Sequence, residues 1–467
     1  MENPGQQQHY EALRKKYPLF VYESCSFVRK SDVLELHFEF SVGDEYFFKP
    51  RISIPYHGAF SASLSDELLY SLTFHVGMVE MISYWKAFCS PRILVKPFGL
   101  NPGQQQWWKK LFRYGLGEFF YTNGITIPGI EVFSFEFPRQ VSFLKKVTPP
   151  PLNEKVLIPV GGGKDSVVSL ELLKQFSHDN LAVVVNHRGA TRQVLEVAGF
   201  GQEKVLEVKR TIDPLLLQLN EQGFLNGHTP FSALLAFVTS LSACLSGSRY
   251  IALSNESSAN EVTIPGTIVN HQYSKSLEFE RDFREYFADN IFMGLEYFSF
   301  LRPLNELQIA ALFSQMKPYH PVFKSCNAGS KTDSWCGTCS KCLFTWIILS
   351  PFIPEEQMRR IFGKDLFEDP ALRGLMDQLT GASVNKPFEC VGTLEEVNVA
   401  MATVAGQRTT GQSGQLPVLL EHYVEGDLFE KYKQQDLQAV LEGFHQPHFL
   451  AKDFEIILQK ALDQIRQ

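Results

Sequence analysis

The residues best suited to chemistry stand together at 161–166, where glycines, a lysine, an aspartate and a serine form the sequence GGGKDS. The apolar run 156–160 precedes them directly, and the stretch VVSLELLK follows with helical periodicity. Glycines let backbone N–H groups approach an anion, and a helix N-terminus favours negative charge. Asp165 follows Lys164, whereas a Walker A loop has Ser or Thr at that place. The segment predicts a strand, a phosphate-binding turn and a helix, with an ordinary strand–helix turn as the alternative.

The order G-G-x-D-S resembles the PP-loop of the N-type ATP pyrophosphatases. Enzymes of that superfamily split ATP into AMP and pyrophosphate, and they usually leave an adenylate on a substrate oxygen. Their loop usually begins with Ser, and Gly161 at this place removes one hydroxyl contact to pyrophosphate but leaves the backbone cradle. The residues that this resemblance assigns to ATP and its Mg²⁺ are Gly161, Gly162, Gly163, Lys164, Asp165 and Ser166.

Four cysteines form a second group with the spacing of metal ligands. The segment SCNAGSKTDSWCGTCSKC contains Cys326, Cys336, Cys339 and Cys342. Two residues lie between Cys336 and Cys339, and two lie between Cys339 and Cys342. Closely spaced thiolates suit a tetrahedral S₄ site, which is typical of structural zinc, although C-x₂-C-x₂-C spacing also occurs in iron–sulfur proteins. Buried thiols without a metal are the third interpretation. The spacing and its neighbours resemble the zinc site of the 7-cyano-7-deazaguanine synthases, which are themselves PP-loop enzymes.

Side chains suited to acid–base chemistry are concentrated between these two motifs. Glu256 lies in SNESSANE, which directly follows a predicted strand, and His228 lies just ahead of a predicted helix. His271 and Lys275 lie in VNHQYSKSLEFE. Carboxylates and histidines near an ATP site are what proton transfer needs, although for any one of these residues a structural role is the alternative. Further candidates for the same cleft are Asn255, Asn260, Glu261, Tyr273, Glu280 and Arg302.

Longer segments resemble the MurL family of UDP-N-acetylmuramoyl-L-alanyl-L-glutamate epimerases. They are GGGKDSVVSLELLK, GFLNGHTPFSALLAF, IALSNESSANE, VNHQYSKSLEFE, YFSFLRPLNELQIA, WCGTCSKCLF and FECVGT, together with SYWKAFCSP and LGEFFYTN nearer the N-terminus. The resemblance covers roughly residues 20 to 400. It implies that ATP and Mg²⁺ drive inversion of the terminal L-glutamate of UDP-MurNAc-L-Ala-L-Glu, which supplies D-glutamate to peptidoglycan.

The chemistry implied by this resemblance agrees with the residues. An α-hydrogen beside a carboxylate is barely acidic, and adenylation removes the carboxylate charge, so that a base can take the proton and an acid can return one to the other face. The expected proton-transfer residues are His228, Glu256, His271 and Lys275. Asn186, at the end of the second predicted strand, is the expected adenosine contact.

The elements that must position these residues alternate between strand and helix. Apolar strands are expected at 156–160, 181–186 and 249–253, with helices at 165–176 and 230–246 between them. Thr229 and Pro230 are expected as the N-cap and first residue of the second helix, and Gly247 as its C-terminal stop. This pattern predicts an α/β fold with a doubly wound, mainly parallel sheet, whose ligand lies at the carboxyl ends of the strands. The resemblance implies that the sheet is of the PP-loop (HUP-like) type.

Three domains are expected along the chain. Residues 1–147 predict an N-terminal α+β domain for substrate binding, because strand-like segments such as VLELHFEFSV flank the helical segment DELLYSLTFHVGMVEMISYWKAF. A proline-rich linker at 147–151 separates it from the ATP-binding catalytic domain, 152–350, which carries the four cysteines as a zinc-binding insert. Residues 351–467 predict a mainly helical region that ends in an amphipathic segment near 454–465.

Composition limits the partners. The net charge is −7 and the pI is about 6.0, and no cluster of Lys and Arg stands out, which argues against a nucleic-acid-binding protein. The N-terminus is polar and lacks the apolar region of a signal peptide, so we expect a cytoplasmic protein without a membrane partner, whose eight cysteines are reduced or bind metal. Two alternatives to the epimerase are a PP-loop adenylating enzyme of RNA or deazapurine modification, acting by thiolation or nitrile synthesis, and a nucleotide-sensing module.

Overall fold

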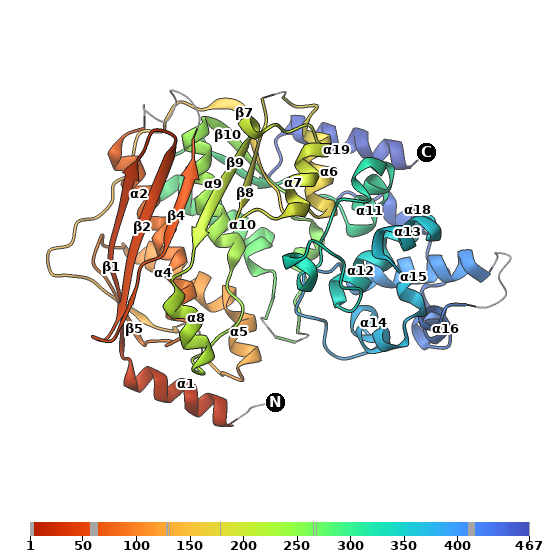
Figure 1. Cartoon of the computed structure of the whole chain (residues 1–467), viewed down its shortest axis with the longest axis horizontal. Helices are drawn as coiled ribbons and strands as arrows, with labels where there is room; N and C mark the ends of the chain where they lie inside the picture. The colour runs from red at the N-terminus through yellow and green to blue at the C-terminus, as the bar shows by residue number, and fades with distance from the viewer. Residues whose placement is uncertain are drawn as a thin grey trace. The chain divides into compact units, whose positions relative to one another are not determined.

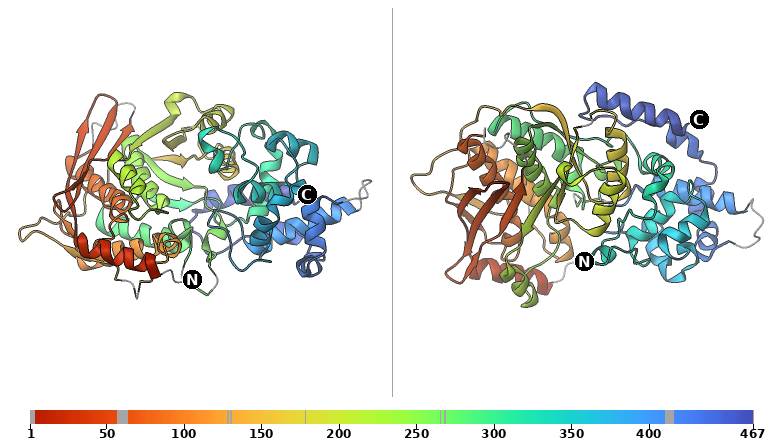
Figure 2. Two further views of the ribbon diagram at one scale, coloured as in Figure 1. Left: turned by 60° about the horizontal axis from the view of Figure 1, so that its bottom comes forward. Right: turned by 45° about the horizontal axis from the view of Figure 1, so that its top comes forward.

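The computed structural model describes residues 4–56, 64–127, 129, 131–177, 179–264, 266–267, 269–409 and 416–466. The chain forms two compact units that are interleaved along the sequence, and Figures 1 and 2 show their helices and strands coloured in chain order. The first unit comprises Met1–Leu157, Leu206–Ile251 and Thr267–Tyr297, and the second comprises Ile158–Val205, Ala252–Gly266 and Phe298–Gln467. The three sequential domains remain a prediction.

A mixed sheet forms the frame of the first unit. Its strands are β1 (Leu19–Arg29), β2 (Val33–Val42), β3 (Tyr46–Phe48), β4 (Arg51–Pro55), β5 (Arg92–Val95), β6 (Ser134–Glu136) and β9 (Val205–Thr211). Their order is β9-β4-β2-β1-β5-β6, with β3 beside β2. β1 and β2 are antiparallel, whereas β5 runs parallel to β1 and β6 parallel to β5. Buried and half-buried side chains alternate along most of β2, which confirms the strand predicted from VLELHFEFSV.

The helices of the first unit are α1 (Pro4–Lys16), α2 (Asp66–Glu80), α3 (Ile82–Trp85), α4 (Pro102–Gly115), α5 (Gly117–Thr122), α8 (Pro214–Glu221), α9 (Phe231–Ser246) and α10 (Leu277–Asn290). The buried helices α2 and α9 pack on each other. An aromatic cluster fills the core between helices, where His75, Trp108 and Tyr286 share hydrogen bonds at 3.0 Å and Phe237 stacks on His75 and Trp108.

The expected start of α9 is wrong by one residue. The helix begins at Phe231 with Pro230 as its N-cap, and Thr229 makes no capping hydrogen bond. The Thr229 hydroxyl instead accepts a hydrogen bond from Lys86 Nζ at 2.9 Å. Gly247 ends the helix with a φ of 67°, in the left-handed region that favours glycine, as expected.

The second unit contains the ends of three strands that begin in the first unit, together with β8 and a helical region. β7 (Asn153–Pro159), β10 (Ser248–Leu253) and β11 (Glu296–Ser299) begin in the first unit and end in the second, where the strand order is β11-β10-β7-β8, with β8 at Leu181–Val185. β7 and β10 are parallel, with Val156 opposite Tyr250. Residues 147–151 lie outside helices and strands, as their prolines predict.

The helices of the second unit are α6 (Lys164–Leu173), α7 (Gly189–Val197), α11 (Glu306–Gln315), α12 (Ser340–Leu349), α13 (Glu355–Phe362), α14 (Arg373–Thr380), α15 (Leu394–Thr409), α16 (Val418–Val424), α17 (Asp427–Tyr432), α18 (Leu437–Leu441) and α19 (Lys452–Ile465). α6 ends at Leu173, three residues earlier than expected, and the Leu173 carbonyl accepts a hydrogen bond from Asn180 Nδ2 at 2.7 Å. The mixed α/β fold and the helical C-terminal region are confirmed. Within the part of the chain described, no helix is both long and apolar enough to cross a membrane.

Candidate active site

The loop 161–166 forms a tight turn between β7 and α6 in the second unit. Gly162 has a φ of 85°, which L side chains rarely adopt, and a Cβ on Gly163 would lie 2.7 Å from Ser325 Oγ. Ser166 Oγ accepts from Gly162 N at 3.2 Å and donates to the Gly163 carbonyl at 2.9 Å, so the serine closes the turn. Gly161 is exposed, and a Cβ added to it would meet no atom within 4 Å. The backbone is therefore open at Gly161, whereas Thr191 and Ser325 lie close to Gly162 and Gly163. An anion would approach this helix N-terminus from the Gly161 side.

Buried charges surround the first turn of α6. Lys164 Nζ lies 2.5 Å from Asp165 Oδ1 and also donates to Glu306 Oε2. Glu396 Oε1 accepts a hydrogen bond from Glu306 N at 2.6 Å, at the start of α11. Glu256 lies in the same electrostatic environment, because the charges of Asp165 and Glu396 act on its carboxyl. Two carboxylates thus pair directly with the Lys164 ammonium, and the carboxyl groups of Glu396 and Glu256 belong to the same electrostatic cluster, in which Arg302 also acts on Glu256.

The pKa values of two buried carboxyl groups in this cluster are raised. Burial, together with the charges of Glu396 and Asp165, raises the pKa of Glu256 to about 7. Burial also raises the pKa of Glu306, against the attraction of Lys164. Carboxylate oxygens suit Mg²⁺, which is commonly held by one or two carboxylates together with phosphate oxygens. Asp165, whose side chain is 37% exposed, fits such a ligand, whereas the Lys164 ammonium is engaged with carboxylates.

A second group of titratable side chains lies in the first unit. Glu118 of α5 places Oε2 against two histidines: it is hydrogen-bonded to His271 Nδ1 and lies 3.2 Å from His228 Nδ1. The two imidazole rings are 4.7 Å apart between centroids. Lys275, in the short turn Tyr273–Lys275, is half-buried, and its charge acts on His228. Three of the four predicted proton-transfer residues are thus together, whereas Glu256 belongs to the second unit.

The protonation of His228 follows from its surroundings. Burial, together with the charges of His271, Lys86 and Lys275, lowers its pKa to about 4 against the opposing charge of Glu118. The imidazole is therefore neutral at neutral pH. A neutral imidazole whose Nδ1 faces a carboxylate can keep the Nε2 lone pair as a proton acceptor.

The four cysteines converge as the spacing predicts. The Sγ atoms of Cys326 and Cys339 are 3.8 Å apart, those of Cys336 and Cys342 are 3.7 Å apart, and those of Cys339 and Cys342 are 3.5 Å apart. A tetrahedral ion with metal–sulfur bonds of about 2.3 Å separates its ligands by roughly 3.8 Å. In an iron–sulfur cluster the four thiolates are shared among two or four irons, and thiolates on different irons lie further apart. The thiolates therefore fit a single tetrahedral ion.

The other predicted site residues are distributed over both units. Asn186 follows β8 with a φ of 49°, a left-handed conformation that Asn tolerates better than most residues. Arg302 Nη1 donates to the Glu256 carbonyl at 2.6 Å, and Asn255 Nδ2 donates to Ser299 Oγ at 3.0 Å, which are structural contacts. Glu261 pairs with Lys386. Tyr273 and Glu280 are buried in the first unit, Asn260 is exposed in the second, and the roles of all these residues remain predictions.

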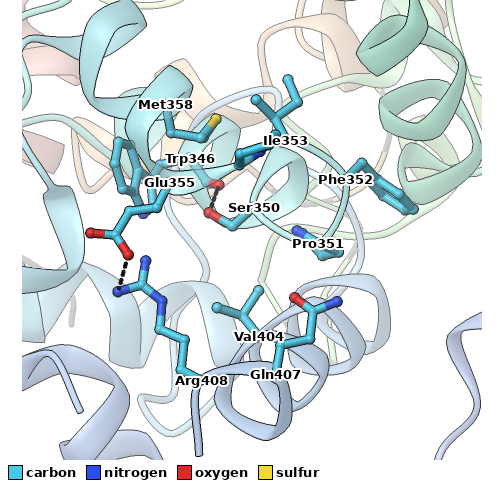
Figure 3. A pocket seen from close by; sticks show the side chains of 11 residues that line it. Trp346, Ser350, Pro351, Phe352, Ile353, Glu355, Met358, Val404, Gln407 and Arg408 are labelled. Carbon is cyan, nitrogen blue, oxygen red and sulfur yellow. Dashed lines mark hydrogen bonds and ion pairs between the residues drawn. The ribbon is translucent and has the colours of Figure 1, made fainter. Parts of the chain in front are cut away.

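A separate pocket of about 350 Å³ lies among α12, α13 and α15, and none of the predicted site residues lines it (Figure 3). An ion pair of 3.1 Å between Arg408 and Glu355 stands beside it, and Trp346 and Met358 line it. It carries no cluster of nucleophilic or metal-ligating groups, and we assign it no role.

Comparison with known proteins identifies the family. The model of the MurL N-terminal domain matches residues 11–300, and that of the MurL C-terminal domain matches residues 322–434. The chain belongs to the MurL family. Three curated relatives bear the name UDP-N-acetyl-alpha-D-muramoyl-L-alanyl-L-glutamate epimerase. The protein of Salinispora tropica is 37% identical over 340 residues, 71% of this chain and 72% of the relative. Those of Micromonospora sp. and Xanthomonas oryzae pv. oryzae are 36% and 35% identical, over 71% of this chain and 74% and 73% of their own lengths.

Four charged residues of the two clusters were not predicted from the sequence: Glu118, Lys86, Glu306 and Glu396. Glu118 lies in LGEFFYTN and Lys86 in SYWKAFCSP, two segments that carried the family resemblance without a site role. The sequence could have indicated Glu118, because it is the one carboxylate of LGEFFYTN, a segment that resembles the family. No local pattern showed that it contacts two histidines.

Replacing Cys339 by Ser tests the metal expected in this MurL chain. The wild-type protein should contain about one zinc ion per chain, and the variant should lose it and melt about 10 °C lower, because metal binding contributes to folding free energy. Metal analysis and thermal unfolding measure both effects. Cys25→Ser, at a half-buried cysteine outside the cluster, should keep the metal. Freshly prepared wild-type protein with neither zinc nor iron would refute a metal site at these cysteines, and iron in place of zinc would contradict the assignment to zinc.

Proposed function

We propose that this chain is an ATP- and Mg²⁺-dependent epimerase that inverts the terminal L-glutamate of UDP-MurNAc-L-Ala-L-Glu to D-glutamate and releases AMP and pyrophosphate. The observation that carries the proposal is the relationship to proteins named as this epimerase, at 35–37% identity over 71% of the chain. The reaction would supply D-glutamate for peptidoglycan precursors in the cytoplasm. Two groups of side chains, one in each unit, support separate activation and proton-transfer chemistry.

Activation would use the loop 161–166. Its backbone N–H groups would bind the phosphates of ATP, and Asp165 would hold the Mg²⁺ that neutralises their charge. Attack by an oxygen of the glutamate α-carboxylate on the α-phosphorus of ATP forms an acyl adenylate and expels pyrophosphate. Lys164 would balance the carboxylates of Asp165 and Glu306, which otherwise repel the phosphates. Asn186 would contact the adenosine.

Proton transfer would use the histidine cluster. The mixed anhydride no longer carries the carboxylate charge, so loss of the α-proton no longer places a second negative charge beside the first. Neutral His228 would take the proton on Nε2, while Glu118 orients the imidazole and stabilises the imidazolium that forms. His271 and Lys275 are the candidates for returning a proton to the opposite face. Glu256, with a pKa raised to about 7, is the candidate for proton exchange beside the loop. Water then releases AMP.

Chiral analysis of the glutamate tests this function. The protein is incubated with UDP-MurNAc-L-Ala-L-Glu and Mg²⁺, with and without ATP, and the glutamate enantiomers are separated after hydrolysis. D-Glutamate should appear only with ATP, together with AMP. Formation of AMP without any D-glutamate would point to another adenylation reaction and contradict the proposal.

A further inference from the structure

A pocket of about 230 Å³ in the first unit opens beside the residues that flank His228. Lys86 and Thr229 line it, and Lys86 Nζ donates to the Thr229 hydroxyl at 2.9 Å and to the Gly227 carbonyl. Lys86 thus holds the residue on each side of His228. An occupant of this pocket therefore lies against the segment that carries the proposed proton acceptor.

The pocket contains one positive charge, that of Lys86, with which no carboxylate of the described residues forms an ion pair, although Glu118 attracts it at longer range. Only 6% of Lys86 is exposed, and both of its hydrogen-bond acceptors are neutral, with no ion pair to a described carboxylate. Arg210, the other cation of the lining, is by contrast neutralised by buried Glu80, at 2.8 and 3.1 Å. Burial lowers the pKa of Lys86 to about 8, so the ammonium persists at neutral pH. An unpaired buried charge is unfavourable, and an anionic ligand would compensate it.

The other residues that line the pocket indicate which further chemical groups its ligand has. Asn220 Oδ1 is buried and has no hydrogen-bond partner among the described residues, so it can accept from an N–H group. Ile212, Leu216 and Leu234 supply an apolar wall. A ligand with a carboxylate, a short aliphatic chain and an amide N–H matches these three features, and an amino-acid residue at the end of a peptide has all of them.

We propose that this pocket binds the side-chain γ-carboxylate of the substrate's terminal glutamate, with Lys86 as its counter-ion. The assignment rests on the proposed function, in which the α-carboxylate is activated and the γ-carboxylate keeps its charge. Lys86 is then a specificity residue, because a neutral glutamine side chain would leave its charge uncompensated. Asn220 accepts from the peptide amide in the same arrangement.

Binding of two ligands that differ only in this group tests the proposal. UDP-MurNAc-L-Ala-L-Glu and UDP-MurNAc-L-Ala-L-Gln are titrated calorimetrically into the protein without ATP. The wild type should bind the glutamate ligand about 30-fold or more tightly, since truncating one partner of a buried charge pair has effects of this size. Lys86→Met should bind both ligands within about threefold of each other, and Lys86→Arg should restore part of the preference.

Controls separate the possible failures. Lys30→Met, which removes an exposed lysine of the same unit, should keep the wild-type preference. A Lys86→Met protein that keeps the preference would overturn the proposal, as would one that weakens both ligands equally, because Lys86 would then serve the shared nucleotide diphosphate. If Lys86→Met does not fold by circular dichroism, Asn220→Asp decides instead, because its added carboxylate should weaken the glutamate ligand selectively. Failure of the wild type to bind either ligand would contradict the proposed function itself.

Discussion

The Asp165→Asn variant should form AMP at least about 10³-fold more slowly than the wild type while keeping its fold, because loss of an anionic metal ligand removes charge stabilisation at the transferring phosphate. Asp165 lies in the first turn of α6 with its side chain partly open to solvent, which suits a ligand to Mg²⁺. Lys164 would keep Glu306 as its partner, so the buried charge remains compensated. Pyrophosphate release with substrate and ATP measures the effect.

The matched control is Asp179→Asn, which changes an exposed aspartate beyond α6 in the same unit and should leave the rate unchanged. Thermal unfolding checks that both variants are folded. A near-normal rate of AMP formation in Asp165→Asn would remove the basis for assigning the loop 161–166 to ATP.

Glu118→Gln and His228→Ala should lose epimerisation by about 10² to 10⁴-fold while still forming AMP and pyrophosphate with the substrate. The reason is that Glu118 contacts both His271 and His228, whereas the proposed activating loop lies in the other unit. A glutamine cannot stabilise an imidazolium through its charge. Parallel assays of AMP and of D-glutamate from the same reaction measure the two steps separately.

Glu131→Gln provides the control, since Glu131 is an exposed carboxylate of the same unit that pairs with Lys109. It should retain both activities. If Glu118→Gln inverts glutamate at the wild-type rate, the histidine cluster has no part in proton transfer.

Local patterns in the sequence predicted the elements that depend on local physics. The alternation in VLELHFEFSV gives β2, the glycines of 161–163 give a turn before α6, and the close spacing of Cys336, Cys339 and Cys342 brings three thiolates together. Gly247 ends α9 because its left-handed backbone favours glycine. Each of these results depends on residues within a few positions of each other.

Contacts between distant residues were not predictable in the same way. Glu118 meets His271 across 153 positions, Lys164 meets Glu306 across 142, and Lys86 meets Thr229 across 143. No periodicity links such pairs, because tertiary folding alone brings them together. The failed N-cap at Thr229 has the same origin: the hydroxyl is engaged by Lys86 rather than by the local backbone.

Solvent deuterium exchange tests most directly whether activation precedes proton removal. The wild-type protein is incubated in D₂O with UDP-MurNAc-L-Ala-L-Glu and Mg²⁺, with and without ATP, and mass spectrometry follows the glutamate α-position. Deuterium is expected at the α-carbon only when ATP is present, because the α-proton becomes acidic only after the adjacent carboxylate has lost its charge. Deuterium incorporation at the same rate without ATP would contradict this order of events.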